Sequence, residues 1–202
     1  QPFSPSAAAA GARALKAAAL DILSALGAQE EATLAAAFAD ATCMSETMAA
    51  LEALGASGAA AFDDALATFE AKWRDMPLVI DKWFAVQAAA PRQDALERAR
   101  RLRSRGDFEL RNPNRVRALG AAFAMRNPRA FHAADGAGYK FLAELAADID
   151  PINPALAARL LTPFENWKRF DTARQTHARA ALQPLADTPK LSKNAREMVE
   201  RT

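Results

Sequence analysis

The sequence predicts an all-α fold, an α-α superhelix of the HEAT or armadillo type with about ten to twelve helices. Alanine supplies much of the 51% apolar content, and alanine has the highest helix propensity of all residues. Only 8 glycines and 7% aromatic residues are present, whereas sandwiches and barrels need many turns and β-branched strands. Apolar residues also recur at helical spacing almost throughout, and no segment alternates as a strand would.

Four apolar stripes in the first half of the chain each predict an amphipathic helix that buries this face. They comprise Leu15, Ala19, Ile22, Leu23 and Leu26; Met44, Met48, Leu51 and Leu54; Phe62, Leu66, Phe69 and Trp73; and Leu78, Val79, Trp83 and Val86. Gly27 and Gly55 follow the first two stripes, as the glycines that end helices do. Pro77 separates the last two stripes.

Three further stripes in the second half predict helices in the same way. They comprise Val116, Leu119 and Phe123; Tyr139, Leu142, Leu145 and Ile149; and Leu156, Leu160, Phe164 and Trp167. Asn112 before Pro113 predicts an N-cap with proline in the first turn, and Pro163 predicts a kink or split inside the last stripe. One helical domain over residues 1–202 is expected; because no strict internal repeat is present, a compact irregular bundle is the alternative to a solenoid.

The charge distribution is uneven along the chain. Residues 1–100 hold 8 Lys and Arg against 13 Asp and Glu, whereas residues 101–202 hold 18 against 11. The basic second half fits an anionic partner or an acidic neighbouring domain. Arg98, Arg100, Arg101, Arg103 and Arg105 end one predicted helix, where cations are favourable and usually solvated. No aromatic residues are interleaved for base stacking, so we expect no nucleic-acid partner.

Cys43 is the only cysteine, so an intrachain disulfide is excluded and a reducing, cytoplasmic location is predicted. No stretch is long and apolar enough to suggest a membrane partner. The chain starts at Gln1 rather than at methionine, which indicates a fragment of a longer protein.

No catalytic residue, metal ligand or cofactor is predicted in this chain, which alone is expected to be inactive. His132 and His177 are its only histidines; they lie far apart, and neither forms the helical spacing of a zinc site. We interpret His132 as a packed or capping residue at a helix junction and His177 as a solvated surface residue. Cys43 has no neighbouring histidine to activate it, and Gly136 with Gly138 predicts a turn before a helix rather than a phosphate loop.

Three arginines beside apolar stripes are candidate ligand-binding residues. They are Arg115, Arg117 and Arg159, of which Arg117 and Arg159 flank these stripes rather than lying on fully polar faces. A guanidinium group pairs bidentately with a carboxylate, so these side chains are suited to bind one. The alternative is an internal salt bridge that fixes helix packing.

Ordered motifs along the chain resemble the C-terminal helical domain of the zinc aminopeptidase N (alanyl aminopeptidase) family. The likeness is strongest between Met76 and Phe141. The motifs are Asp81-Lys82-Trp83-Phe84, Asn112-Pro113-Asn114-Arg115, Ala130-Phe131-His132, Asp135-Gly136, Asn153-Pro154, Ala158-Arg159-Leu160 and Lys168-Arg169-Phe170-Asp171. Their occurrence in order is more specific than any single motif.

The resemblance implies a non-catalytic part of a metalloaminopeptidase that removes N-terminal residues from short peptides. It implies a zinc ion in an upstream catalytic domain of the same polypeptide, and a superhelical domain that caps the active-site chamber. Arg117 and Arg159 match family arginines that face this chamber, so the implied role is to hold the carboxylate or backbone carbonyls of a bound peptide. Two other functions remain open: a stand-alone helical-repeat interaction module and, less favoured, a nucleic-acid-binding protein.

Overall fold

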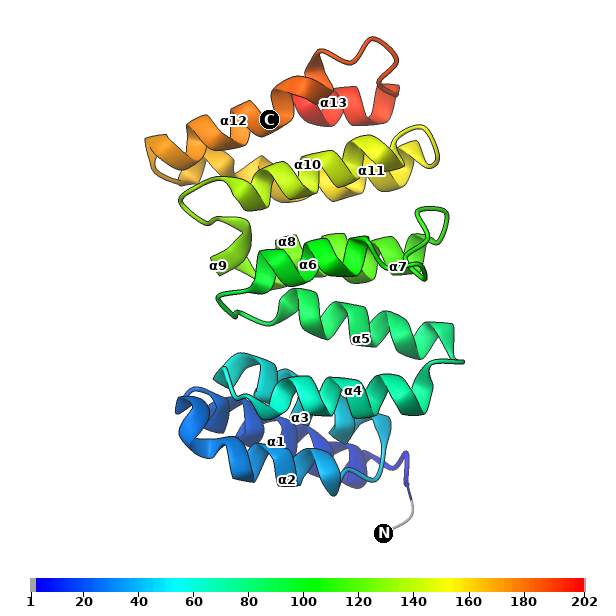
Figure 1. The fold of residues 1–202 in the computed structure, drawn as a ribbon, viewed down its shortest axis with the longest axis vertical. Helices are drawn as coiled ribbons and strands as arrows, with labels where there is room; N and C mark the ends of the chain where they lie inside the picture. Colours follow the sequence, from blue (N-terminus) through cyan, green and yellow to red (C-terminus); the bar gives the residue numbers. More distant parts are fainter. Residues whose placement is uncertain (1–2, 202) are drawn as a thin grey trace. The chain divides into compact units, whose positions relative to one another are not determined.

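The structure, a computed structural model, describes residues 3–201, and every regular element in that range is a helix (Figure 1). The helices form twelve continuous segments, because η1 runs into α2, α7 into η2 and α8, and α11 into η3. The predicted all-α class and the predicted number of helices are therefore confirmed. Two compact units are present: one contains residues up to Val86 together with Ala90–Arg92, and the other contains Gln87–Ala89 and the residues from Gln93 onward. The single domain expected over residues 1–202 stays a prediction.

The first unit is built around α3, which packs against α1, α2 and α4. Its helices are α1 (Ala7–Ser24), the 3₁₀-helix η1 (Gly27–Glu30), α2 (Glu31–Ala39), α3 (Met44–Ser57), α4 (Ala61–Trp73) and most of α5 (Pro77–Ala89). Leu51, Leu54 and Phe62 are fully buried in this core. The Trp83 ring on α5 is also buried, and its Nε1 donates a hydrogen bond to the Leu66 carbonyl at 2.9 Å. The tryptophan of the Asp-Lys-Trp-Phe motif is thus a packing residue.

Gly55 does not end α3, and that prediction was wrong. It lies buried inside the helix, where a Cβ atom would meet the Phe62 ring and the Ala90 methyl group at 3.1 Å. The helix ends at Gly58, whose φ of 78° suits glycine. Gly55 therefore allows close packing inside the helix, and the next glycine, Gly58, ends the helix.

The buried face of α1 also differs from the prediction. Leu20 and Ser24 are buried against the unit, whereas Leu15 and Ile22 are 74% and 71% exposed. Leu26, just after the helix, is exposed as well. Alanine-rich helices carry weak amphipathic signals, because alanine is tolerated on both faces, and the stripe of larger residues turned out to be the outer one.

The second unit contains two rows of helices, and Figure 1 shows α10 and α11 side by side within it. Its elements are α6 (Ala95–Arg103), α7 (Pro113–Val116), η2 (Arg117–Ala121), α8 (Ala122–Arg126), α9 (Pro128–Phe131), α10 (Ala137–Ile149), α11 (Pro154–Leu161), η3 (Thr162–Arg169), α12 (Thr172–Ala186) and α13 (Lys193–Arg201). Helix α10 packs against α11 and α12, and α11 packs against α13. Edge-to-face ring contacts join Phe131 to Phe123, Tyr139 and Phe164 in the core.

Two local predictions in this unit have different outcomes. Pro163 does split its helix, because α11 ends at Leu161 and the chain continues as the 3₁₀-helix η3. The expectation that the arginine run is solvated was wrong at its first member. Arg98 is buried, and its guanidinium group lies 3.0 Å from Asp94.

Candidate functional site

The segment that carries Arg117 begins as its sequence predicts. The Asn112 side chain accepts hydrogen bonds from the backbone N–H groups of Asn114 and Arg115 at 3.0 and 3.2 Å, and Pro113 occupies the first turn. An N-cap of this kind satisfies donors that the helix itself leaves free. Helix α7 then continues without a break into η2, which is π-helical, and into α8. No sequence pattern predicted this wider turn, which begins at Arg117.

Arg115 and Arg117 point to opposite sides of this helix. Arg115 is buried; its guanidinium group donates to the Asp107 carbonyl at 2.6 Å and lies 3.8 Å from the Asp107 carboxylate. The hydrogen bond from Arg105, followed by the charges of Arg105 and Arg115, lowers the pKa of Asp107. Arg117 is exposed, and within the described residues it donates only to the Asn114 side chain, at 2.6 Å. Arg115 is therefore an internal packing residue, and Arg117 is available to a ligand.

Arg159 lies on α11, which is capped like α7. The Asn153 side chain accepts a hydrogen bond from the Leu156 N–H at 3.0 Å, and Pro154 follows it in the first turn. Arg159 is exposed, and no hydrogen bond or ion pair holds its guanidinium group within residues 3–201. Arg159 therefore forms no internal salt bridge within the described part of the chain.

The two helices that carry Arg117 and Arg159 run side by side in the same direction. A Cβ atom on Gly120 would meet the Leu145 and Leu160 side chains at 2.7 and 3.1 Å, so η2 and α11 approach closely at this glycine. Ten residues further along α11–η3, the Phe170 ring stacks on His132, 4.0 Å between ring centroids. These two contacts define how the segment α7–α8 is aligned with α11–η3. The helices that carry Arg117 and Arg159 are therefore neighbours.

A groove of about 520 Å³ lies further along this pair of helices, between the end of α8 and η3. We call it the α8–η3 groove. Met125 and Pro128 line one side, and Asn166 and Arg169 line the other. No hydrogen bond or ion pair holds the side chains of Asn166 and Arg169 within the described part of the chain. The groove therefore offers a cation and an amide to a ligand.

His132 forms the inner end of this groove and is held on several sides. Its Nδ1 lies 2.8 Å from the Tyr139 hydroxyl, and its carbonyl accepts a hydrogen bond from Arg174 Nε at 2.7 Å. Burial, and secondly the nearby Arg174 charge, lower the pKa of His132. Burial also raises the pKa of Tyr139. The interpretation of His132 as a packed residue at a helix junction is confirmed, since it follows α9 directly.

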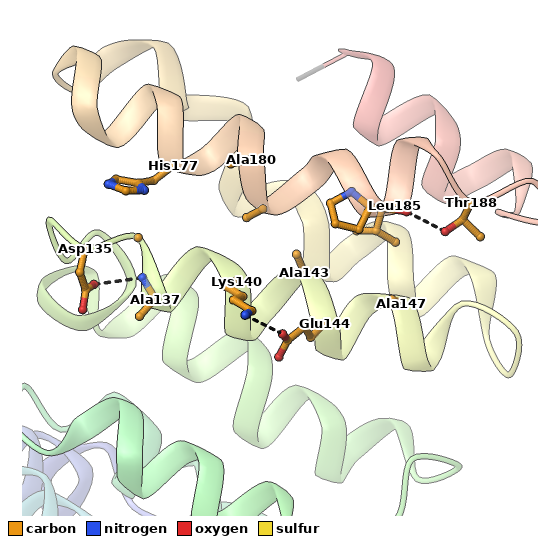
Figure 2. A pocket seen from close by; sticks show the side chains of 13 residues that line it. Asp135, Ala137, Lys140, Ala143, Glu144, Ala147, His177, Ala180, Leu185 and Thr188 are labelled. Carbon is orange, nitrogen blue, oxygen red and sulfur yellow. Dashed lines mark hydrogen bonds and ion pairs between the residues drawn. The ribbon is translucent and has the colours of Figure 1, made fainter.

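A second groove, of about 580 Å³, is lined by residues of α10 and α12 and of the turn before α10 (Figure 2). Ala143 and Ala147 line it from α10, and Ala180 lines it from α12. Its charged groups are already engaged: Lys140 lies 3.9 Å from Glu144, and the Asp135 carboxylate accepts from the Ala137 N–H at 3.0 Å. It offers a ligand mainly small apolar surface.

His177 lines this second groove and is not the fully solvated residue that the sequence suggested. It is half-buried, with its Cβ against Gly136, the residue with φ 69° that precedes α10. The predicted turn at Gly136 is confirmed.

Residues 3–201 contain no group of three or more His, Cys, Asp or Glu side chains placed to hold a metal ion. None of the helices that the structure describes has the length and apolar content needed to cross a bilayer.

Sequence reasoning identified Arg117 and Arg159 but missed Asn166 and Arg169. Arg169 was visible only as part of the Lys-Arg-Phe-Asp motif, and Asn166 lay in a stretch with no motif at all. Asn166 and Arg169 share one face because η3 is a 3₁₀-helix, and the residue spacing did not predict this geometry.

Comparison with known proteins gives a consistent result. A family model described as "Domain of unknown function (DUF3458_C) ARM repeats" matches residues 1–202. Aminopeptidase N of Caulobacter vibrioides is 44% identical over 200 residues, which is 98% of this chain and 23% of that protein. Aminopeptidase N of Escherichia coli is 41% identical over 80% of this chain and 19% of that protein.

A solved structure of Legionella pneumophila aminopeptidase A in complex with aspartic acid has the same fold, with a TM-score of 0.78 and 35% identity. The match covers 86% of this chain and 20% of that chain. The chain thus spans about a fifth of the length of these relatives. The matches confirm the resemblance to the aminopeptidase N family, and the ARM repeats confirm the armadillo-like fold class.

Proposed function

The chain belongs to the DUF3458_C family of ARM-repeat domains, and from this membership we propose that it is the non-catalytic C-terminal domain of an aminopeptidase N-like zinc enzyme. One observation supports the proposal most strongly. Relatives named aminopeptidase N match 80% to 98% of this chain at 41% to 44% identity, yet the match occupies only 19% to 23% of their length. A domain of a longer peptidase has this pattern.

In this proposal the zinc ion and the catalytic groups belong to an upstream domain of the same polypeptide. The helical domain caps the active-site chamber, limits entry to short peptides and keeps bulk water away from the bound substrate. A cytoplasmic location, suggested by the single cysteine, remains part of the proposal.

Arg117 and Arg159 are the proposed peptide-binding residues. Both are exposed, they lie on neighbouring helices, and neither is neutralised by a carboxylate in the described residues. A guanidinium group can bind a peptide carboxylate bidentately or donate to backbone carbonyls. Such contacts hold the peptide in register with the catalytic groups and act as positioning contacts rather than as chemistry.

The test is kinetic and uses the full polypeptide that carries this sequence. Replacing Arg117 or Arg159 by glutamine should lower kcat/KM for tetrapeptides about 10- to 100-fold, because each removes a hydrogen bond to a charged group. Hydrolysis of aminoacyl p-nitroanilides, which have no peptide carboxylate, should change little. Arg100→Gln is the matched control, since Arg100 is an exposed arginine on α6, a helix that carries neither proposed binding residue. Unchanged tetrapeptide kinetics in both variants would refute the assignment.

A stand-alone helical-repeat interaction module is the second candidate function. The uncovered apolar face of α1, with Leu15 and Ile22, favours it because exposed aliphatic rows mark interaction surfaces. A purified full polypeptide that lacks peptidase activity with added zinc would favour this candidate over the first.

A further inference from the structure

We propose that the α8–η3 groove is a distal carboxylate site, which binds the C-terminal end of a peptide that has passed Arg117 and Arg159. Arg169 and Asn166 supply its polar contacts. The inference rests on the proposed peptide-binding function and deepens it by adding a site that selects for peptide length. Helix geometry, free polar groups and charge carry the argument.

The 3₁₀ geometry of η3 aligns one wall of the groove. Side chains three residues apart eclipse one another in a 3₁₀-helix, so Pro163, Asn166 and Arg169 form a straight row. All three line the groove. In an α-helix the same residues would turn by about 60° at each step and leave the groove. Arg159 lies four residues before Pro163, on the preceding α-helix α11.

The π-helical turn of η2 aligns side chains on the other wall of the groove, which α8 forms. Four residues of α-helix overshoot a full turn by about 40°, so a row with this spacing drifts around the helix. The wider turn of η2 at Arg117–Ala121 offsets that drift before α8 begins. Arg117 and Met125, both exposed, therefore lie along one face. The helical segment that carries Arg117 and the one that carries Arg159 both lead to the groove.

The groove is electropositive where it would meet a carboxylate. Among the described residues, Glu165 is the only acidic one that lines the groove, and the Arg201 guanidinium group pairs with it. Arg169 and Asn166 have no hydrogen-bond or ion-pair partner within residues 3–201, so their donors are free to bind. The lowered pKa of His132 keeps its ring neutral near pH 7, which leaves Arg169 as the groove's unpaired cation. A guanidinium group beside an amide is a suitable pair of donors for a carboxylate.

The rest of the lining suits the last side chain of a peptide. Met125 is 68% exposed on the rim, and a methionine side chain adapts to apolar groups of different shape. Pro128 lies on the same wall, and the stacked rings of His132 and Phe170 close the inner end. The groove volume of about 520 Å³ accommodates an apolar terminal residue.

The spacing of the two arginines on α11–η3 sets the peptide length. Ten residues separate Arg159 from Arg169, which is roughly 18 Å at the rise of an α-helical turn followed by 3₁₀-helix. An extended peptide advances about 3.3 Å per residue, so about five or six residues bridge this distance. Short peptides reach only Arg159, whereas longer ones also reach Arg169.

The test compares peptides of three to ten residues, each as free acid and as C-terminal amide, on the full polypeptide. For free acids long enough to reach the groove, Arg169→Gln should raise KM about tenfold or more and leave kcat nearly unchanged. Tripeptides and all amides should be unaffected. Lys168→Gln is the matched control, because it removes the same charge from the neighbouring residue, whose ammonium group lies over the Trp167 ring and not in the groove. A KM that rises equally for tripeptides, for amides or in the control would overturn the proposal.

A binding measurement on the 202-residue chain separates this site from the peptidase function. A fluorescein-labelled octapeptide acid should bind with an affinity about tenfold lower after Arg169→Gln. Asn166→Asp, which places a second negative charge beside the carboxylate at an exposed position, should also weaken binding. If the octapeptide amide binds as tightly as the acid, the distal carboxylate site is refuted, even where the full polypeptide proves to be an aminopeptidase. If the acid binds as expected but the full polypeptide cleaves no peptide, the peptidase function fails and the site stands.

Discussion

Helices α1 and α10 look alike as sequences and behave differently in the structure. Both are rich in alanine and carry aliphatic residues at helical spacing. Eight of the thirteen residues of α10 are buried, whereas only Leu20 and Ser24 are buried among the eighteen residues of α1. Apolar periodicity therefore shows which residues share a face, but whether that face is covered depends on which elements pack against it.

The difference lies in the neighbours of each helix. Helix α10 contacts α6, α9, α11 and α12 within its unit, and Phe141 on α10 packs edge-on against Phe123, 5.2 Å between ring centroids. Helix α1 packs mainly on α3, on one side. The proposed binding residues all lie in the unit of α10, where close packing on the inner side fixes the outward direction of Arg117, Arg159 and Arg169.

The largest expected effect is the loss of an aromatic side chain from α10. Phe141→Ala should destabilise the second unit by about 3–5 kcal/mol, because it removes a buried ring and leaves a cavity. Urea unfolding followed by hydrogen exchange and mass spectrometry would report the second unit separately from the first. A loss below about 1 kcal/mol would mean that α10 is packed no more tightly than α1.

An intermediate effect is expected from pH, again in the second unit. Both histidines lie there, and the pKa of His132 is lowered in the folded state by burial and by Arg174. The unfolded chain, with a histidine pKa near 6.5, then binds a proton more readily than the folded chain. The contribution of His132 to stability is thus fully present above about pH 6.5 and is lost as pH falls toward its folded pKa.

This pH effect can be measured with a matched pair of variants. Hydrogen exchange of α9, α10 and α12 should speed up between pH 7.5 and pH 5.5, after correction for the intrinsic rates, more than exchange of α3. His132→Gln should remove most of the difference, whereas His177→Gln should retain it. The idea fails if His132→Gln retains the full pH dependence.

The smallest effect is expected on the outer face of α1. Ile22→Ala should change the free energy of unfolding by no more than about 0.5 kcal/mol, since the side chain is already in water. Leu20→Ala, two residues earlier on the inner face, should cost about 2–3 kcal/mol. Thermal unfolding of the two variants checks this. Equal losses would mean that another surface covers Ile22 in solution.

Much of the fold could be predicted from local chemistry. Asn112 before Pro113 caps its helix as expected, because this pair satisfies the first free N–H groups and presets the first turn. Asn153 before Pro154 caps α11 in the same way, although no cap was predicted there. Pro163 split its helix as expected, since proline removes one N–H donor. The prediction that Gly55 ends its helix was wrong. An apolar stripe followed by glycine looks the same in sequence whether the glycine ends the helix or packs closely against another element.

The candidate site was only partly accessible to sequence reasoning. Arg117 and Arg159 were found through a resemblance to a family, and their outward direction required the structure. Asn166 and Arg169 join them through the eclipsed turns of η3, and Arg117 aligns with Met125 through the π-helical turn of η2. The sequence predicted the break at Pro163 but not the kind of helix that follows it, nor the π-helical turn, which packs closely on α10 and α11 at Gly120.

The sequence was sufficient to establish that this protein is helical, that one helix begins at Asn112-Pro113, and to which family of domains the chain belongs. These properties follow from propensity, capping and motif order, which act over a few residues. The folded structure was needed to show that the aliphatic row of α1 faces outward, that Arg98 and Arg115 are internal, and that Asn166 and Arg169 line one groove. Burial and side-chain direction depend on elements far apart in the chain, and no local pattern records them.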